Sequence, residues 1–321
     1  PLELPGAVTQ PLPGLDIASA RSAGGRPDLL EARGLVVRVQ PDITAVTRTF
    51  DYYVPESWVD DGRAAKIRVG SLVRMQFHGR RTAGWVTEVD VTPDPSVEVL
   101  PLLKWSSHGP PADVIDLARW AAWRWAGLLP HLLRAASPPR MVAQIAGLER
   151  RNPPDAAAEV RRAFDGPLTV VRTAPGDDGA VLARAAASFG HALVLVPTID
   201  QRRTVARALR SIGVVVAEYN EQWERSAAGA VTIGTRLAAF APMPAVDAVL
   251  VLDEHASSHK EERTPSWNAR DVAIERARRA GVPCVLASPS PSLESLEAAD
   301  RLLAPERSTE RNSWPLVDII D

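Results

Sequence analysis

The chain has 321 residues, enough for two or three domains, and its 45% hydrophobic and 24% charged residues are typical of a globular protein. A formal net charge of −2 excludes a molecule that binds nucleic acid through its overall charge, so any such binding must be local. The single cysteine, Cys284, excludes a disulfide framework and a cysteine-rich zinc site within this sequence. No signal peptide and no membrane-spanning apolar run is found, which predicts a cytoplasmic protein without a membrane partner.

The first part of the chain predicts a tail followed by a small β domain. Residues 1–33 are rich in proline, glycine and alanine and show no lasting periodicity, so we expect a disordered tail. Four strands separated by turn residues are expected at 34–40, 48–54, 70–77 and 83–90, within a domain covering 34–108.

A basic window lies inside this β domain and contains no acidic residue between positions 63 and 81. Its cations are Arg63, Lys66, Arg68, Arg74, Arg80 and Arg81. A basic stripe on a small β domain can neutralise phosphates, which favours local DNA binding. A solvated strand face is the alternative interpretation of the same pattern.

The region 109–165 is expected to be a helical linker. Residues 113–129 show a helical pattern and contain Trp120, Trp123 and Trp125, of which the first two share a helix face. Nucleic-acid bases can stack on such side chains, but a core or a domain interface is the favoured interpretation.

From residue 166 onward, apolar strands alternate with helices. Strands are expected at 168–172, 192–196, 214–217, 231–234, 248–252 and 283–287, with helices at 180–189, 199–211 and 268–280. This alternation predicts an α/β lobe over 166–300 with a mainly parallel sheet covered on both faces. Residues 301–321 are interpreted as the start of a second lobe that is missing from the sequence.

The turn between the first strand and helix of this lobe has the setting of a phosphate-binding loop. A working loop would end in Gly-Lys-Ser/Thr, but Gly176 is followed here by Asp177 and Asp178. Two like charges about 4 Å apart repel by roughly 4 kcal/mol at an effective dielectric constant near 20, so carboxylates here disfavour a triphosphate. We therefore expect a degenerate nucleotide site.

A series of motifs in one order resembles the PriA family of replication-restart proteins and, in its second half, the first RecA-like lobe of superfamily 2 helicases. The segments that carry the resemblance are Phe50-Asp-Tyr52, Ile233-Gly-Thr-Arg236, Asp253-Glu-His255, Ala269-Arg-Asp271 and Ser288-Pro-Ser-Pro-Ser-Leu-Glu-Ser295. The resemblance covers about residues 34–321. It implies a β domain that binds forked DNA, followed by a RecA-like helicase lobe.

The resemblance also implies that the motor chemistry is lost. Asp177 and Asp178 stand at the family's loop Lys and Thr, and Leu252 stands at the aspartate that would hold Mg²⁺. Asp253 falls on a Glu position, while Glu254 and His255 match the family. Phosphoryl transfer depends on positioned positive charge around the γ-phosphate. We therefore expect no catalytic residue, no bound metal and no cofactor. ATP and Mg²⁺ enter only under the alternative of an active 3′–5′ helicase with an unusual site.

For DNA, the resemblance implies a pocket for the 3′ end of a leading strand. Phe50 would stack on the terminal base and Asp51 would accept a hydrogen bond from the terminal hydroxyl, with either His78 or Gly79 at the family's glycine position. In the second half, Thr235 and Arg236 would contact a DNA backbone.

The sequence thus predicts a nucleoid-associated protein that binds branched DNA with a 3′ end and helps to reload the replication machinery, without helicase activity. By resemblance, its partners would be other primosome proteins and single-stranded-DNA-binding protein. A protein-interaction scaffold that has lost DNA binding is the second alternative.

Overall fold

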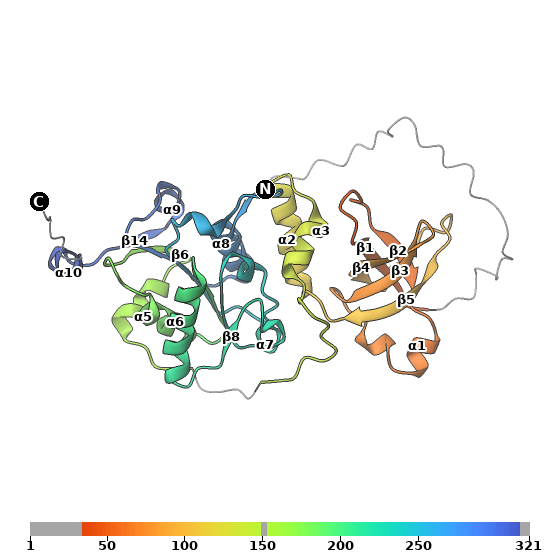
Figure 1. Cartoon of the computed structure of the whole chain (residues 1–321), viewed down its shortest axis with the longest axis horizontal. Helices are drawn as coiled ribbons and strands as arrows, with labels where there is room; N and C mark the ends of the chain where they lie inside the picture. Colours follow the sequence, from red (N-terminus) through yellow and green to blue (C-terminus); the bar gives the residue numbers. More distant parts are fainter. Residues whose placement is uncertain (1–33, 149–152, 315–321) are drawn as a thin grey trace, which may run out of the picture. The chain divides into compact units, whose positions relative to one another are not determined.

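The computed structural model describes residues 34–148 and 153–314 (Figure 1). The tail expected at 1–33 and the strand expected near residue 316 lie outside the described residues.

The first described unit of the fold is a closed barrel of five strands in the order β1-β2-β5-β3-β4. Its strands are β1 (Val36–Pro41), β2 (Phe50–Tyr53), β3 (Leu72–Phe77), β4 (Arg80–Val89) and β5 (Leu100–Ser107). Short α1 (Ser57–Asp60) and η1 (Ala64–Lys66) lie between β2 and β3. The four expected strands are confirmed, but the prediction missed β5. Pro101 breaks the strand pattern there, although the residue is tolerated because it lies near the strand's start.

Side chains that alternate along the strands fill the barrel core, and strands β1 and β4 approach each other closely at one glycine. Val37, Val39, Val73 and Met75 are fully buried in its core. Gly84 of β4 lies against Val39, where any Cβ would collide with the Val39 side chain. Glycine therefore lets β4 cross β1 and complete the barrel.

Two helices follow the barrel, α2 (Ala112–Arg124) and α3 (Leu129–Ala136). The single helix expected over 113–129 is thus wrong at its C-terminal end, where Ala126 adopts a left-handed φ of 47°. Trp120 packs against the main hydrophobic core, whereas Trp123 is 71% exposed. The expectation that both tryptophans form an interior stripe therefore holds only for Trp120.

The second half forms a seven-stranded sheet in the order β14-β6-β13-β10-β7-β9-β8, with every neighbouring pair parallel. The strands are β6 (Leu168–Arg172), β7 (Ala192–Leu195), β8 (Val216–Glu218), β9 (Val231–Gly234), β10 (Ala248–Leu252), β13 (Cys284–Ser288) and β14 (Arg301–Leu303). The strand β13 separates β6, which leads into the phosphate-loop-like turn, from β10, which leads to Asp253. The α/β fold with a small β domain, a helical region and a lobe with a parallel sheet is confirmed.

Helices cover both faces of this sheet. Val249 and Val251 of β10 belong to the core shared with α2, α3 and α8, whereas Leu250 and Leu252 belong to the core shared with α5 and α6. The helices are α4 (Ala158–Arg161), α5 (Ala180–Ala187), α6 (Ile199–Ser211), α7 (Trp223–Ala227), α8 (Ala269–Ala280), α9 (Leu293–Ala298) and α10 (Arg307–Asn312). Shorter elements are η2 (Arg162–Phe164), η3 (Arg236–Phe240), η4 (Ser257–His259), β11 (Lys260–Glu261) and β12 (Trp267–Asn268).

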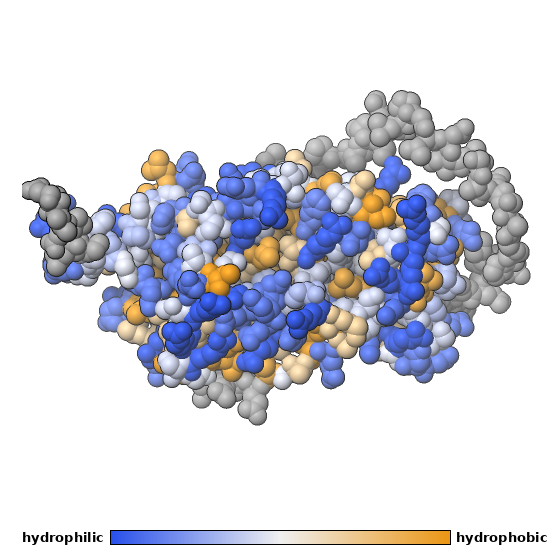
Figure 2. Space-filling view, viewed as in Figure 1, coloured by the Kyte–Doolittle hydropathy of each residue, from blue (hydrophilic) through white to orange (hydrophobic). Residues whose placement is uncertain are grey.

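The face of the molecule drawn in Figure 2 is mostly hydrophilic, with hydrophobic residues in scattered patches. In the parts of the chain that the structure describes, no helix has both the length and the apolar character needed to span a membrane.

Candidate functional site

The phosphate-loop-like turn between β6 and α5 is closed by its own carboxylates. Asp177 Oδ1 accepts a hydrogen bond from the Gly179 amide at 2.8 Å, and Asp178 Oδ1 accepts one from the Ala180 amide at 2.9 Å. Amides at the start of a helix are the groups that would otherwise hold a phosphate. Here the loop supplies its own anions to them.

Leu252 closes the other side of this turn. Gly179 has a left-handed φ of 75°, and a Cβ built on it would collide with the Leu252 side chain. Leu252 is 2% exposed, so an apolar side chain fills the place where strand β10 meets the loop. A hard divalent cation needs oxygen ligands, and Leu252 offers none. Within the described ranges, no three His, Cys, Asp or Glu side chains gather in a way that could hold a metal ion.

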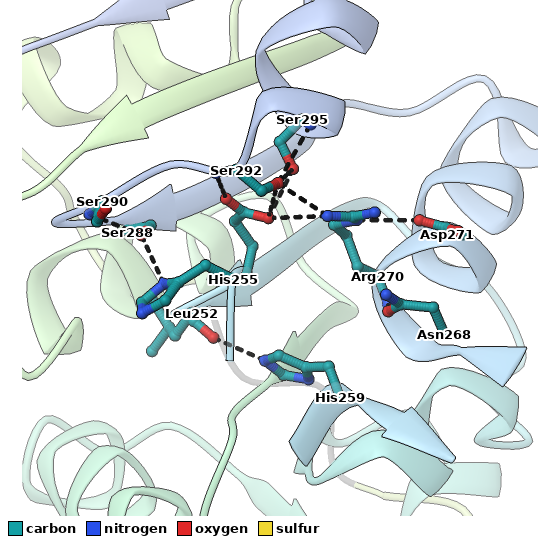
Figure 3. Close-up of polar contacts among 11 residues, drawn as sticks. Leu252, His255, His259, Asn268, Arg270, Asp271, Ser288, Ser290, Ser292 and Ser295 are labelled. Carbon is teal, nitrogen blue, oxygen red and sulfur yellow. Dashed lines mark hydrogen bonds and ion pairs between the residues drawn. The ribbon is translucent and has the colours of Figure 1, made fainter. Parts of the chain in front are cut away.

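Glu254, which follows β10, is bound on both carboxylate oxygens. Its Oε1 accepts from the Ser292 amide at 2.6 Å, and its Oε2 accepts from the Ser295 and Ser292 hydroxyls at 2.6 and 2.9 Å. The Arg270 guanidinium lies 3.3 Å from the same Oε2 and also pairs with Asp271 (Figure 3). The Glu254 side chain is fully buried. Burial raises its pKa, but the hydrogen bonds from Ser295, Ser292 and Arg270 outweigh this and leave the pKa lowered.

The neighbouring polar residues also have intramolecular partners. His255 Nδ1 lies 2.7 Å from Ser288 Oγ, which accepts from the Ser290 amide (Figure 3). Asp253, with a left-handed φ of 45°, accepts from Gln201 Nε2 at 3.0 Å. Every residue matching the helicase Asp-Glu-His motif is therefore already engaged within the fold.

The buried His259 belongs to the same cluster, and sequence reasoning did not single it out. Its Nε2 lies 2.9 Å from the Leu252 carbonyl oxygen. Burial lowers the pKa of His259, which favours a neutral ring that donates this bond. The contact holds the end of β10 in place.

In the barrel, Phe50 and Asp51 point to opposite sides of β2 because they are consecutive strand residues. Phe50 meets Phe77 edge-on at 4.9 Å, and Phe77 meets His78 at 4.4 Å. His78 and Gly79 both have left-handed φ angles, 46° and 74°, in the two-residue turn between β3 and β4. The structure thus brings Phe50 close to the turn, but it does not bring Asp51 there.

Asp51 instead pairs with Arg38 of β1, directly opposite it across the strands. Arg38 Nε and Nη2 donate to the two carboxylate oxygens of Asp51 at 2.8 and 3.2 Å, and Arg38 Nη1 donates to Glu88 at 3.1 Å. These contacts raise the pKa of Arg38, the hydrogen bond that it donates to Asp51 most of all. Sequence reasoning missed Arg38 because the contact depends on strand register, which the sequence pattern does not specify.

The basic window separates into paired and unpaired cations. Arg63 pairs with Asp61 at 2.5 Å and lies over Trp58, while Lys66 lies over Trp105. Four cations are exposed and have no acidic partner among the described residues: Arg68, Arg74, Arg80 and Arg81.

In the second half, Thr235 and Arg236 stand where η3 begins. Arg236 Nη2 lies 2.9 Å from Glu261 Oε2, so its charge is already balanced, and Thr235 is half-buried. Any DNA contact by Arg236 would compete with this ion pair.

Comparison with known proteins places residues 36–138 in the family described as the 3′ DNA-binding domain of PriA. The replication restart protein PriA of Bacillus subtilis is 30% identical over 147 residues, covering 41% of this chain and 18% of that protein. PriA of Synechocystis is 34% identical over 151 residues, covering 40% of this chain and 18% of that protein. The matched parts therefore span less than a fifth of the length of these relatives.

Solved structures match at lower similarity. The Hef helicase domain of Pyrococcus furiosus has a TM-score of 0.35 and 15% identity, covering 48% of this chain and 38% of that one. Saccharomyces cerevisiae Dbp5 bound to Nup159, Gle1, IP6 and ADP has a TM-score of 0.35 and 12% identity, covering 46% of this chain and 48% of that one. Residues 36–138 thus match the PriA 3′ DNA-binding domain, and about 40% of the chain is similar to named PriA replication restart proteins.

Proposed function

We propose that the chain binds the 3′ end of forked DNA through its barrel during replication restart, and that its RecA-like lobe acts without ATP hydrolysis. The DNA-binding part is supported by the family match over residues 36–138 and by the exposed, unpaired cations of the barrel. Such cations neutralise backbone phosphates whatever the base sequence. Other primosome proteins and single-stranded-DNA-binding protein are the partners we propose from the similarity to PriA.

The loss of ATP chemistry is supported by one arrangement in the lobe. The loop carboxylates Asp177 and Asp178 satisfy the amides at the start of α5, and Leu252 packs against Gly179 on the other side. Phosphate and metal would each have to displace a group of the protein itself. The loop itself carries two carboxylates where phosphoryl transfer requires positioned positive charge.

Asp51 remains the proposed reader of the terminal hydroxyl. Arg38 occupies one lone pair on each of its carboxylate oxygens, which leaves acceptor capacity for a 3′-hydroxyl. A terminal phosphate would be repelled by the same carboxylate. Arg38 fixes the orientation of this group before DNA arrives.

The experiment compares fork DNA ending in a leading-strand 3′-hydroxyl with the same fork ending in a 3′-phosphate, by fluorescence anisotropy without nucleotide. We expect tighter binding of the hydroxyl end and loss of this preference in Asp51→Ala. Glu88→Gln is the matched control, since it removes the other acidic partner of Arg38 and leaves Asp51 in place. Equal affinity for the two ends in the unchanged protein would refute end reading, and no binding of either fork would favour a protein-interaction scaffold.

A further inference from the structure

A second group of barrel residues lies on the outer face of β3, β4 and β5. Arg74 stands directly opposite Lys104 of β5 on one side and Ala83 of β4 on the other. Two residues further along β3, Gln76 stands opposite Arg81. Directly opposite residues share one face of a sheet, so Arg74, Lys104 and Arg81 point outward together. We call these three residues the outer basic face.

An irregularity in β5 brings Lys104 to this face. Met75 is opposite Leu102, and Arg74, which precedes Met75 in β3, is opposite Lys104. Leu103 therefore has no partner in β3 and forms a β-bulge in β5. Without it, strict alternation from the buried Leu102 would turn Lys104 toward the barrel interior. Bulges of this kind re-aim side chains and are frequent next to functional sites. The barrel thus places a second cation beside Arg74.

The outer basic face has no counter-charge of its own. All three side chains are exposed, and within the part of the chain that the structure describes none forms an ion pair or hydrogen bond with an acid. Arg38 and Arg63 of the same barrel do have carboxylate partners. Like charges directly opposite each other destabilise a strand pair. The outer basic face therefore carries a repulsion that a bound anion would relieve.

We propose that Arg74, Lys104 and Arg81 form a clamp for the phosphates of a nucleic-acid backbone on the outer face of β3, β4 and β5. This inference rests on the proposed DNA-binding function and adds a second contact region, with Lys104 as a new member. An acidic protein is the less suitable ligand because protein interfaces are organised around apolar or aromatic anchors. Gln76 and Ala83, which lie between the cations, supply none, and the exposed Leu103 of the bulge is a single aliphatic side chain.

The test is a double variant, Arg74→Gln with Lys104→Gln, in the full chain. Arg140→Gln together with Arg207→Gln is the matched control, because it removes the same charge from exposed positions that have no acidic partner among the described residues. Each protein is titrated with forks ending in a 3′-hydroxyl and in a 3′-phosphate over a series of salt concentrations. The melting temperature is measured on the free protein.

For the double variant we expect affinity to fall on the order of tenfold or more at 0.1 M salt, equally for both forks, with a salt slope smaller by about two. The hydroxyl preference should stay unchanged, and the free protein should melt no lower than the unchanged chain. The control should keep its affinity within about twofold, as a general loss of charge would not single out one face.

Three results would overturn the clamp. The first is a double variant that binds nucleic acid as tightly as the unchanged protein. If the melting temperature of that variant also rose, the result would favour an acidic protein as the ligand. A lower melting temperature accompanying weaker binding would mean that the two side chains hold the barrel together. An equal loss of affinity in the control variant would show that the effect comes from net charge and not from this face. Failure of end reading is a separate outcome, because it would appear as equal affinity for the two forks in the unchanged protein while the double variant still binds more weakly.

Discussion

At the scale of single residues, Glu254 is the buried carboxylate at the centre of a hydrogen-bonded cluster in the lobe. It accepts from two hydroxyls, one amide and one guanidinium in a fully buried setting. Glu254→Gln should lower the free energy of unfolding by about 3 kcal/mol, because it leaves Arg270 without this partner and places an amide donor among donors. Denaturant unfolding measures the loss. The exposed Glu294→Gln on the neighbouring helix should change it by less than about 0.5 kcal/mol.

The same carboxylate predicts a pH dependence. The pKa of Glu254 in the folded protein is lowered from its ordinary value of 4.5. Its contribution to stability is therefore complete above about pH 4.5 and is lost as the pH falls through the lower folded pKa. The unchanged protein should lose more stability than Glu254→Gln over this acidic range. Parallel losses in the two proteins would show that other carboxylates dominate acid unfolding.

At the scale of elements, helix α8 holds η3 through one buried cation. Arg276 is 4% exposed and donates from Nη1 to the Ala239 carbonyl at 3.0 Å and from Nη2 to the Ala241 carbonyl at 2.7 Å. Arg276→Met should cost about 1–3 kcal/mol in the free energy of unfolding, since these buried carbonyls lose a donor. Arg278→Met on the same helix is the control, because the Arg278 side chain is 70% exposed and its partner Glu275 keeps a second ion pair with Arg279, so the loss should be less than about 1 kcal/mol.

The opposite outcome has a clear physical meaning. A Met variant as stable as the unchanged protein would show that the cost of burying the guanidinium cancels its hydrogen bonds, as happens when apolar residues replace some buried charges. It would also remove α8 as the element that positions η3 and, with it, Arg236.

The elements that the sequence predicted best are those with uninterrupted apolar runs. The expected strands at 168–172, 231–234 and 248–252 match the observed β6, β9 and β10, because strands buried on both faces read as continuous hydrophobic segments. Strand β5 was missed since Pro101 and a bulge interrupt its alternation. The break between α2 and α3 was missed although Gly127, a residue typical of helix ends, directly follows Ala126.

The candidate site residues also fall into those that the sequence could identify and those that it could not. The motif positions Asp177 and Leu252 could be found in the sequence because a functional pattern fixes what ought to stand there. Arg38 and Lys104 could not, since their importance comes from the residue opposite them on another strand. A one-residue slip in register would turn each of them to the other face. Contacts set by register therefore need the structure.

At the scale of the whole molecule, the closed loop predicts that ATP with Mg²⁺ leaves the stability of the protein unchanged. A ligand that binds only the folded state stabilises it by RT ln(1 + [L]/Kd), about 2.7 kcal/mol at one hundred times Kd. We therefore expect no shift in melting temperature with millimolar ATP and Mg²⁺ beyond that of a salt control. Fork DNA in the same assay should raise the melting temperature and serves as the positive control.

Restoring the loop residues alone should not restore this response. In Asp177→Lys with Asp178→Thr, the loop gains the cation and hydroxyl of a working site, but Leu252 still packs against Gly179 and offers no oxygen to a metal. ATP with Mg²⁺ should again give no shift in melting temperature. If the two aspartates alone blocked the nucleotide site, this double variant would bind ATP and its melting temperature would rise. A clear shift in this double variant would show that Leu252 does not block the site, and the loss of the motor would then rest on the two aspartates.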